Sequence, residues 1–332
     1  MDWQNMMSLS LQSALGPSAV IYCLAAIGLN VHFGYTGLLN FGQAGFMAVA
    51  GYAMASIVTT WGLSLWLGVV VGLLLTVVLA LLLGVPTLRL RADYLAIVTI
   101  AAAEIIRQTV GSVTLLEYFG GQDGLTGFND SFRSLNPYSG RIGIPGVVTW
   151  SSYDAWVMTV GWLLVALSCL VVWLLMRSPW GRVLKSIRED EDAVRSLGKN
   201  VYAYKMQSLI IGGIFGALAG FITAFRSAAI NPSFFATDIT FYAYTVLLIG
   251  GAARVFGPVV GAIIFWFLLT FLGLFFDSAT NGANPLIPDW IMTNTQASLI
   301  RFIFLGLGLM LLMIFRPQGI FGDRRELAID AR

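Results

Sequence analysis

The chain has 332 residues, of which 58% are hydrophobic and only 11% are charged, and its mean hydropathy is +0.81. A soluble domain needs more charged side chains than this to cover its surface, so a soluble enzyme is excluded. The net charge is +2, and the basic residues lie between hydrophobic runs rather than on one soluble face. This distribution argues against a nucleic-acid binder.

The positions of the charged residues predict a polytopic membrane protein. After Asp2, the next Asp, Glu, Lys or Arg is Arg89, so 86 residues pass without one of these side chains. Because ~20 residues are enough to cross a bilayer core, this run must fold back on itself. The whole chain, 1–332, is therefore predicted to form one all-α membrane helical bundle. Its nine expected spans cover about 13–32, 36–60, 63–85, 94–115, 154–177, 205–226, 240–253, 257–276 and 298–316.

The second and seventh of these spans differ from a continuous apolar helix. The second is rich in glycine and carries two amides, and the seventh is short and ends in Gly250-Gly251. Broken or re-entrant backbone is tolerated at membrane depth only where protein or a water-filled cavity satisfies its polar groups. Paired broken segments in the two halves of a chain also indicate a transport site at their interface.

Asn40 and Gln43, in the second span, are the candidate residues of a translocation path. They lie three residues apart on one helical face and offer hydrogen-bond donors and acceptors without charge. Gly42 and Gly45 would allow close approach of another backbone. These features suit the passage of a polar solute, and they would equally suit packing between helices, so the sequence leaves both interpretations open.

The Lys and Arg residues predict the orientation, because they are enriched in cytoplasmic loops. The loop from Arg177 to Lys205 holds seven of them. Placing this loop in the cytoplasm puts fourteen basic residues inside and four outside, with Arg107 within a span. The C-terminus is then expected inside and the N-terminus outside. If the span at 36–60 is re-entrant, the N-terminus changes side.

The expected cytoplasmic segment 178–204 has the pattern of short amphipathic helices. Pro179 can open a helix and Gly198 can end one, and apolar residues recur between them at helical spacing. Such helices can dock in a groove of a partner protein. They could also lie on anionic lipid, although the four consecutive acidic residues 189–192 would be repelled there. Docking is therefore the favoured interpretation.

Other polar and reactive residues carry weaker signals. Glu104 and Arg107 lie three apart within a span and can pair, either as a structural ion pair or as part of a gate. The single histidine, His32, is expected to be a polar side chain at the membrane interface. Cys23 and Cys169 lie in apolar segments and are expected to be small buried side chains rather than a disulfide or a metal pair.

No motif in the sequence indicates that this chain hydrolyses ATP or catalyses a reaction. The Gly198-Lys199 pair lacks the glycine-rich lead of a nucleotide-binding loop and is followed by Asn200. No zinc-protease or hydrolase pattern occurs, and neither a metal site nor a bound cofactor is expected.

Several motifs together resemble the branched-chain amino-acid permease family of ATP-binding-cassette (ABC) importers, and within it the LivM-type subunits. Asp192-Ala193-Val194 followed by Gly198 is similar to the signature of importer permeases, with Asp192 where Glu is usual. The wider matches extend from about residue 28 to 322 and include the sequences 28–30, 33–46, 94–99 with 104–105, 181–191, 250–251 with 256–261, and 316–322.

The resemblance implies a multi-pass subunit of a bacterial inner-membrane importer, with its C-terminus in the cytoplasm. The implied partners are a second, LivH-like permease, two ATPase subunits that use the ATP, and an extracytoplasmic solute-binding protein. The coupling residues implied on this chain are Arg182, Ile187, Glu189, Asp190, Glu191, Asp192, Ala193 and Gly198. The expected cargo is a branched-chain or other small amino acid. A urea or short-amide permease and a self-sufficient secondary transporter are the alternatives.

Overall fold

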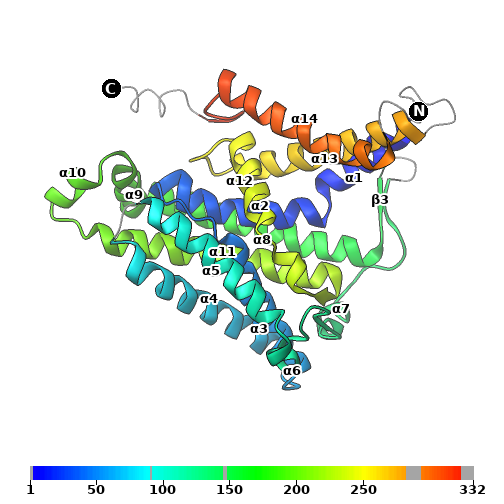
Figure 1. Ribbon diagram of the computed structural model, residues 1–332, viewed down its shortest axis with the longest axis horizontal. Coiled ribbons are helices and arrows are strands. Elements are labelled where there is room, and N and C mark those ends of the chain that lie inside the picture. Colours follow the sequence, from blue (N-terminus) through cyan, green and yellow to red (C-terminus); the bar gives the residue numbers. More distant parts are fainter. Residues whose placement is uncertain (1–2, 90–91, 145–147, 282–292, 323–332) are drawn as a thin grey trace.

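The structure is a computed structural model that describes residues 3–89, 92–144, 148–281 and 293–322, and within these residues it is almost entirely helical (Figure 1). This confirms the predicted all-α membrane bundle. The main helices are α2 (Pro17–Leu29), which continues into the π-helix η1 (Asn30–Tyr35), α3 (Gln43–Thr59), α4 (Leu65–Thr87), α5 (Ala92–Val110), α8 (Ser152–Arg177), α11 (Val201–Ser227), α12 (Asp238–Gly250), α13 (Gly257–Asn281) and α14 (Asn294–Phe315).

Each of the nine expected spans contains one of these helices, but they are not equally long. Among the described residues, six segments are long and apolar enough to cross a membrane, and α5 with its bent continuation gives a seventh candidate. Helices α3 and α12 have 17 and 13 residues. At ~1.5 Å per residue they are shorter than the ~30 Å hydrocarbon core. These are the two spans in which the sequence indicates breaks.

The span expected at 94–115 is also interrupted. Helix α5 ends at Val110, and the chain bends by 60° before it continues as η2 (Val113–Leu115) and α6 (Leu116–Phe119).

The bundle has two distinct ends (Figure 1). The two helices α9 (Pro179–Glu189) and α10 (Glu191–Ser196) lie at one end, here called the α9 end. The opposite end, called the β3 end, carries α6, α7 (Asp130–Arg133) and β3 (Val148–Trp150). The short connecting elements include two antiparallel pairs, β1 (Leu125–Thr126) with β4 (Ala229–Ile230), and β2 (Ile142–Ile144) with β3, together with η3 (Pro232–Phe235).

Helix α1 (Trp3–Leu15) was not predicted. It is separated from α2 by Gly16, and Pro17 begins α2 at the position where its missing N–H costs nothing. Helix α1 packs against α13, and the Gln12 side chain donates to the Thr149 carbonyl of β3 at 2.6 Å. Polar residues such as Gln12 lower the hydropathy of α1, so its sequence does not have the pattern of an apolar span.

Helix α11 lies at the centre of the bundle, where it packs against α2, α3 and α4. Glycines make these contacts close. A Cβ atom on Gly220 would lie 2.2 Å from the Met47 carbonyl oxygen of α3, and one on Gly28 would lie 2.4 Å from the Gly212 carbonyl oxygen. Small residues of this kind let membrane helices approach to backbone contact. The π-helix η1 packs against α11, and the loop after α12 is joined to η1 through Asn30.

Candidate functional site

The chain leaves its helical path between η1 and α3, and this break is buried inside the bundle. Three polar side chains meet there: His32, Asn40 and Gln43 are each 0% exposed. The Asn40 Nδ2 atom lies 3.0 Å from His32 Nδ1 and 3.3 Å from Gln43 Oε1. Gln43 Nε2 donates to the Gly212 carbonyl of α11 at 3.2 Å. The amides expected to lie on one helical face therefore flank the start of α3 and bond to each other.

The expectation that His32 is an interfacial side chain is wrong. Its Nε2 atom lies 3.1 Å from the Leu209 carbonyl oxygen, which can only accept, so Nε2 carries the proton and Nδ1 accepts from Asn40. The sequence places His32 near the end of an apolar run, but the π-helical turn carries the ring inward, where both nitrogens find partners.

Side chains from distant helices satisfy the open backbone of this break. The Phe41 N–H donates to Thr99 Oγ1 of α5 at 3.0 Å, and the Ala44 N–H donates to Thr240 Oγ1 of α12 at 3.0 Å. The Tyr244 hydroxyl of α12 donates to the Asn40 carbonyl at 2.9 Å and accepts from the Asn40 N–H at 3.2 Å. The break is thus tied to α5 on one side and to α12 on the other.

Gly42 and Gly45 lie where α3 begins against α5. A Cβ atom on Gly42 would lie 2.5 Å from the Thr99 carbonyl oxygen, and one on Gly45 would lie 3.1 Å from Ala103 Cα. A side chain at Gly42 would clash with the α5 backbone, and one at Gly45 would be tightly packed against Ala103. In this structure the buried amides form their hydrogen bonds with other protein groups. Contact of these four residues with a solute stays a prediction.

The predicted amphipathic segment consists of two helices. In α9, Leu184 and Ile187 are buried against the bundle, while Arg182 and Glu189 are exposed. Pro179 is the first residue of the helix, as the sequence indicates. One face of α9 is therefore anchored in this chain and the opposite face is free to contact another protein.

Helix α10 presents the acidic run. Asp190 caps it by accepting from the Ala193 N–H at 2.9 Å, and Gly198 ends it with φ +76°, as expected for a helix terminus. Glu191 pairs with Lys205 and Arg195. Asp192 also lies 3.2 Å from Arg195 Nη1, although its side chain is 89% exposed. Asp190 thus caps α10, Glu191 links it to α11, and the Asp192 carboxylate faces outward.

Arg188, which the sequence did not single out, connects the amphipathic segment to the break. Its Nη1 atom donates to the Gly34 carbonyl in η1 at 2.5 Å. Lys185 Nζ lies 5.8 Å from the centre of the Tyr35 ring in the same turn. A Cβ on Gly37, whose φ is +74°, would touch the Arg188 side chain. No sequence signal relates positions 154 residues apart, so only the fold could identify this contact.

A second structural link at the α9 end involves the loop after α12. The Asn30 side chain accepts from the Ala253 N–H and donates to the Arg254 carbonyl, both at 2.8 Å. The segment after α14 donates from Ile320 and Phe321 to the last carbonyls of α12, at 3.0 and 3.1 Å. The glycine-rich motifs noted in the sequence near 250–261 and 316–322 therefore serve to join η1, α12 and the end of α14.

The Glu104–Arg107 pair forms within α5. Arg107 Nε and Nη2 donate to the Glu104 carboxylate at 2.8 and 2.6 Å. The Glu104 side chain is 39% exposed and the Arg107 side chain is 24% exposed. The predicted ion pair is present, on the surface of this chain rather than at the buried break.

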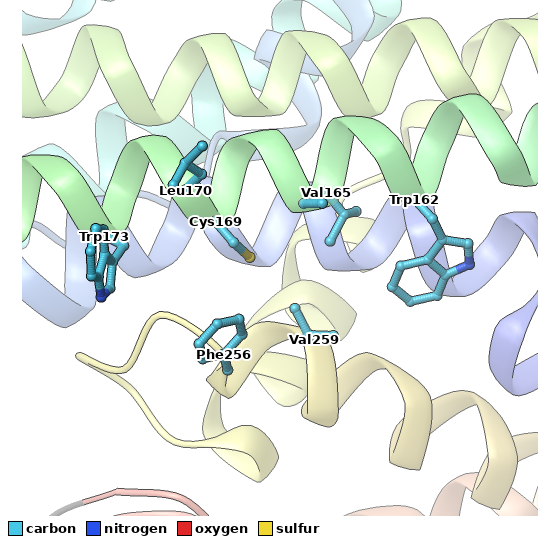
Figure 2. A pocket seen from close by; sticks show the side chains of 8 residues that line it. Trp162, Val165, Cys169, Leu170, Trp173, Phe256 and Val259 are labelled. Carbon is cyan, nitrogen blue, oxygen red and sulfur yellow. The ribbon is translucent and has the colours of Figure 1, made fainter.

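An apolar groove of about 490 Å³ lies between α8 and the start of α13. Trp162, Cys169 and Trp173 of α8 line it opposite Phe256 and Val259 (Figure 2). Cys169 and Cys23 are both buried and unpaired, as predicted. Within the residues that the structure describes, no group of three His, Cys, Asp or Glu side chains could hold a metal ion.

A bundle of apolar helices with a buried polar break and an amphipathic segment at one end fits a multi-pass membrane permease, a transport component rather than an enzyme. Residues 15–314 match the family described as "Branched-chain amino acid transport system / permease component". The chain belongs to this family and is a permease component of an ABC transport system.

Among its relatives is the high-affinity branched-chain amino acid transport system permease protein LivM of Escherichia coli, 32% identical over 91% of this chain and 68% of the relative. The probable LivM of Methanocaldococcus jannaschii is 24% identical over 92% of this chain and 91% of the relative. A nucleoside ABC transporter permease, NupC of Lactococcus lactis, is 29% identical over 67% of each chain.

Proposed function

We propose that this chain forms, with a second LivH-like permease, the transmembrane path for branched-chain or other small amino acids. Two ATPase subunits hydrolyse ATP, and one of them docks on the segment 178–204 at the α9 end of this chain. An extracytoplasmic solute-binding protein delivers the cargo at the β3 end. In this arrangement the α9 end and the C-terminus face the cytoplasm of a bacterial inner membrane, which agrees with the excess of Lys and Arg in the loops of the α9 end.

The observation that carries this proposal is the contact between Arg188 and Gly34. Helix α9 is anchored through Leu184 and Ile187, so an ATPase that moves α9 moves this rigid element as a whole. The Arg188 guanidinium then pulls or pushes the Gly34 carbonyl, which lies six residues before Asn40. A hydrogen bond from a charged donor is stronger than a neutral one, which suits a contact that must transmit movement.

The ATPases contact the outward residues of the coupling segment. Arg182, Glu189, Asp192 and Ala193 are exposed and form the docking surface. Ile187, Asp190 and Gly198 support it, because they fix the packing of α9 and both ends of α10. Glu191 holds α10 to α11 through Lys205. Asp192 contributes the exposed negative charge that a basic groove on an ATPase would recognise.

Asn40, Gln43, Gly42 and Gly45 form the constriction of the path. In the closed conformation the two amides satisfy each other, His32 and the Gly212 carbonyl. Separation of α3 from α11 would free these donors and acceptors toward a passing solute. Because the groups are neutral, they can exchange hydrogen bonds with a zwitterionic amino acid without holding it by charge.

The substrate is the part of the proposal with an explicit alternative. Relatives named for branched-chain amino acids align over nearly the whole chain, which favours an amino acid. A relative named as a nucleoside permease keeps other cargo as an alternative, and a urea or short amide would also match the neutral amides. A binding assay with the associated solute-binding protein separates these substrates.

The proposal is tested by reconstitution in liposomes. The chain is reconstituted alone, and together with its second permease, ATPases and loaded binding protein, and uptake of radiolabelled leucine is measured with and without ATP inside. We expect uptake only from the complete set and only with ATP. Uptake by the chain alone without ATP would instead identify a secondary transporter.

A further inference from the structure

Helix α5 has two different faces. Its inner face supports the buried break, because Thr99 accepts from the Phe41 N–H and Ala103 lies beneath Gly45. Its other face points away from the chain, and Ile105 on that face is 65% exposed. The outward face nevertheless carries polar and charged side chains in a segment that is a candidate membrane span. Contact with lipid alone would not stabilise such side chains.

The polar side chains of the outward face form a cluster confined to α5. The Glu104 carboxylate accepts three hydrogen bonds, two from Arg107 at 2.6 and 2.8 Å and one from Gln108 Nε2 at 2.7 Å. All three donors come from the next turn of the same helix. The ion pair therefore does not join α5 to any neighbouring helix, and a role in holding this subunit's own bundle together does not account for it.

Helix α5 counts as a candidate membrane span together with its bent continuation to Phe119, and the cluster lies within that segment. Ionised side chains in membrane helices face protein or a water-filled cavity rather than lipid. The groove between α8 and α13 is a surface hollow whose described lining residues include no ionised side chain. Apolar side chains such as Trp162, Val165 and Phe256 line it, so lipid can fill it (Figure 2). The hollow on α5, of about 410 Å³, is lined by Glu104, Ile105, Gln108, Thr109 and Ser112, and most of its surface is apolar as well. The charged pair at its edge, rather than the hollow itself, distinguishes this face of α5.

We infer that the outward face of α5 from Glu104 to Ser112 is a water-facing surface in the membrane, covered by the second permease subunit of the importer. This inference rests on the proposed function for the identity of the covering subunit. The second subunit excludes lipid, and the hollow supplies water to the Glu104–Arg107 pair. Because the inner face of the same helix holds Phe41, a movement of α5 against the partner reaches the closed break directly.

The inference is tested by the accessibility of introduced cysteines. Cys23 and Cys169 are both buried, so a background with alanine at both positions leaves only the introduced thiol. Ile105→Cys reports the α5 face, and Leu163→Cys on α8 is the matched control, because the two native side chains are 65% and 68% exposed. The assembled transporter in native membrane vesicles is treated with a charged methanethiosulfonate reagent, which reacts in water but not in lipid.

We expect the thiol of Ile105→Cys to react at least tenfold faster than that of Leu163→Cys. We also expect a short bifunctional thiol reagent to link Gln108→Cys to a cysteine on the second permease, and not to another copy of this chain. Equal, slow reaction of both single variants would overturn the inference by identifying a lipid-facing surface. A cross-link between two copies of this chain would overturn the identity of the partner.

ATP-dependent uptake by the cysteine-free background is measured in the same vesicles. Normal uptake together with an unreactive Ile105→Cys thiol rejects only the α5 surface, whereas ATP-independent uptake by the chain alone rejects the proposed function.

Discussion

Tyr244 and Asn40 are joined by two hydrogen bonds through a single hydroxyl group. The Tyr244 hydroxyl donates to the Asn40 carbonyl at 2.9 Å and accepts from the Asn40 N–H at 3.2 Å. One side chain from α12 thereby satisfies both backbone hydrogen-bonding groups of a residue that lies outside any helix. The buried break between η1 and α3 therefore depends on a residue 204 positions away.

Replacing Tyr244 by Phe is expected to destabilise the closed break. The substitution keeps the ring and leaves both backbone groups of Asn40 without their partner, and a buried unsatisfied group costs ~1–3 kcal/mol. We expect a lower thermal midpoint in detergent and reduced ATP-dependent uptake. Tyr118→Phe is the control, because the Tyr118 side chain is 43% exposed and lies outside the break. Equal behaviour of the two variants would show that the hydroxyl of Tyr244 is dispensable.

Arg188→Ala is expected to uncouple ATP hydrolysis from uptake. Loss of the bond to Gly34 removes a charged hydrogen bond worth ~1.5–3 kcal/mol, and we expect uptake to fall about tenfold or more. Basal ATPase activity and association with the ATPases should persist, because Leu184 and Ile187 still anchor α9. Lys199→Ala, an exposed change in the same segment, serves as the control. Unchanged uptake in Arg188→Ala would remove this contact from the mechanism.

Reversing the charges of the acidic run should weaken ATPase docking. Changing Asp190, Glu191 and Asp192 to Lys together is expected to reduce co-purification of the ATPases while the chain still inserts in the membrane. Asp192→Lys alone should give much of this loss, because that carboxylate is 89% exposed. Full co-purification of the triple variant with normal uptake would argue against docking on α10.

The cap of α10 can be separated from its outward charge. Asp190→Ala removes the acceptor for the Ala193 N–H, and loss of such a cap costs ~0.5–2 kcal/mol. We expect α10 to fray and protease cleavage near Ser196 to become faster. Asp192→Ala should change the cleavage rate much less, because its exposed ion pair with Arg195 contributes less than the cap. Equal cleavage of the two variants would contradict the capping role.

Gly220→Ala should disturb the centre of the bundle. Its Cβ would lie 2.2 Å from the Met47 carbonyl oxygen, so α11 and α3 must move apart, and overpacking of this kind typically costs ~1–3 kcal/mol. Gly306→Ala in α14 is the control, since nothing lies within 4 Å of the added atom. We expect a lower thermal midpoint in detergent for the first variant and an unchanged one for the second.

The amphipathic segment was predictable because its evidence is local. Pro179, Gly198 and the apolar spacing between them define both helices, and the structure places helix boundaries where these residues indicate. The same local reasoning gave the wrong environment for His32 and passed over α1. Hydropathy identifies the residues that leave water, but it does not report a π-helical turn or a polar helix that packs beside the bundle.

The amides Asn40 and Gln43 show the limit more directly. The sequence identified them as unusual in an apolar span, and it left open whether they face a solute or another helix. Their partners His32 and Gly212 come from two different helices, and no spacing rule connects these positions.

The sequence by itself determined that this protein is a many-helix membrane protein with an amphipathic segment between two spans, because apolar runs and helix caps act over a few residues. The permease family was indicated by the resemblance of its motifs. Only the tertiary structure decided which groups satisfy the broken backbone, how Arg188 reaches Gly34, and which face of α5 carries its ion pair outward. Those relationships arise from the packing of distant helices, and each depends on atoms that approach one another only after the whole bundle has formed.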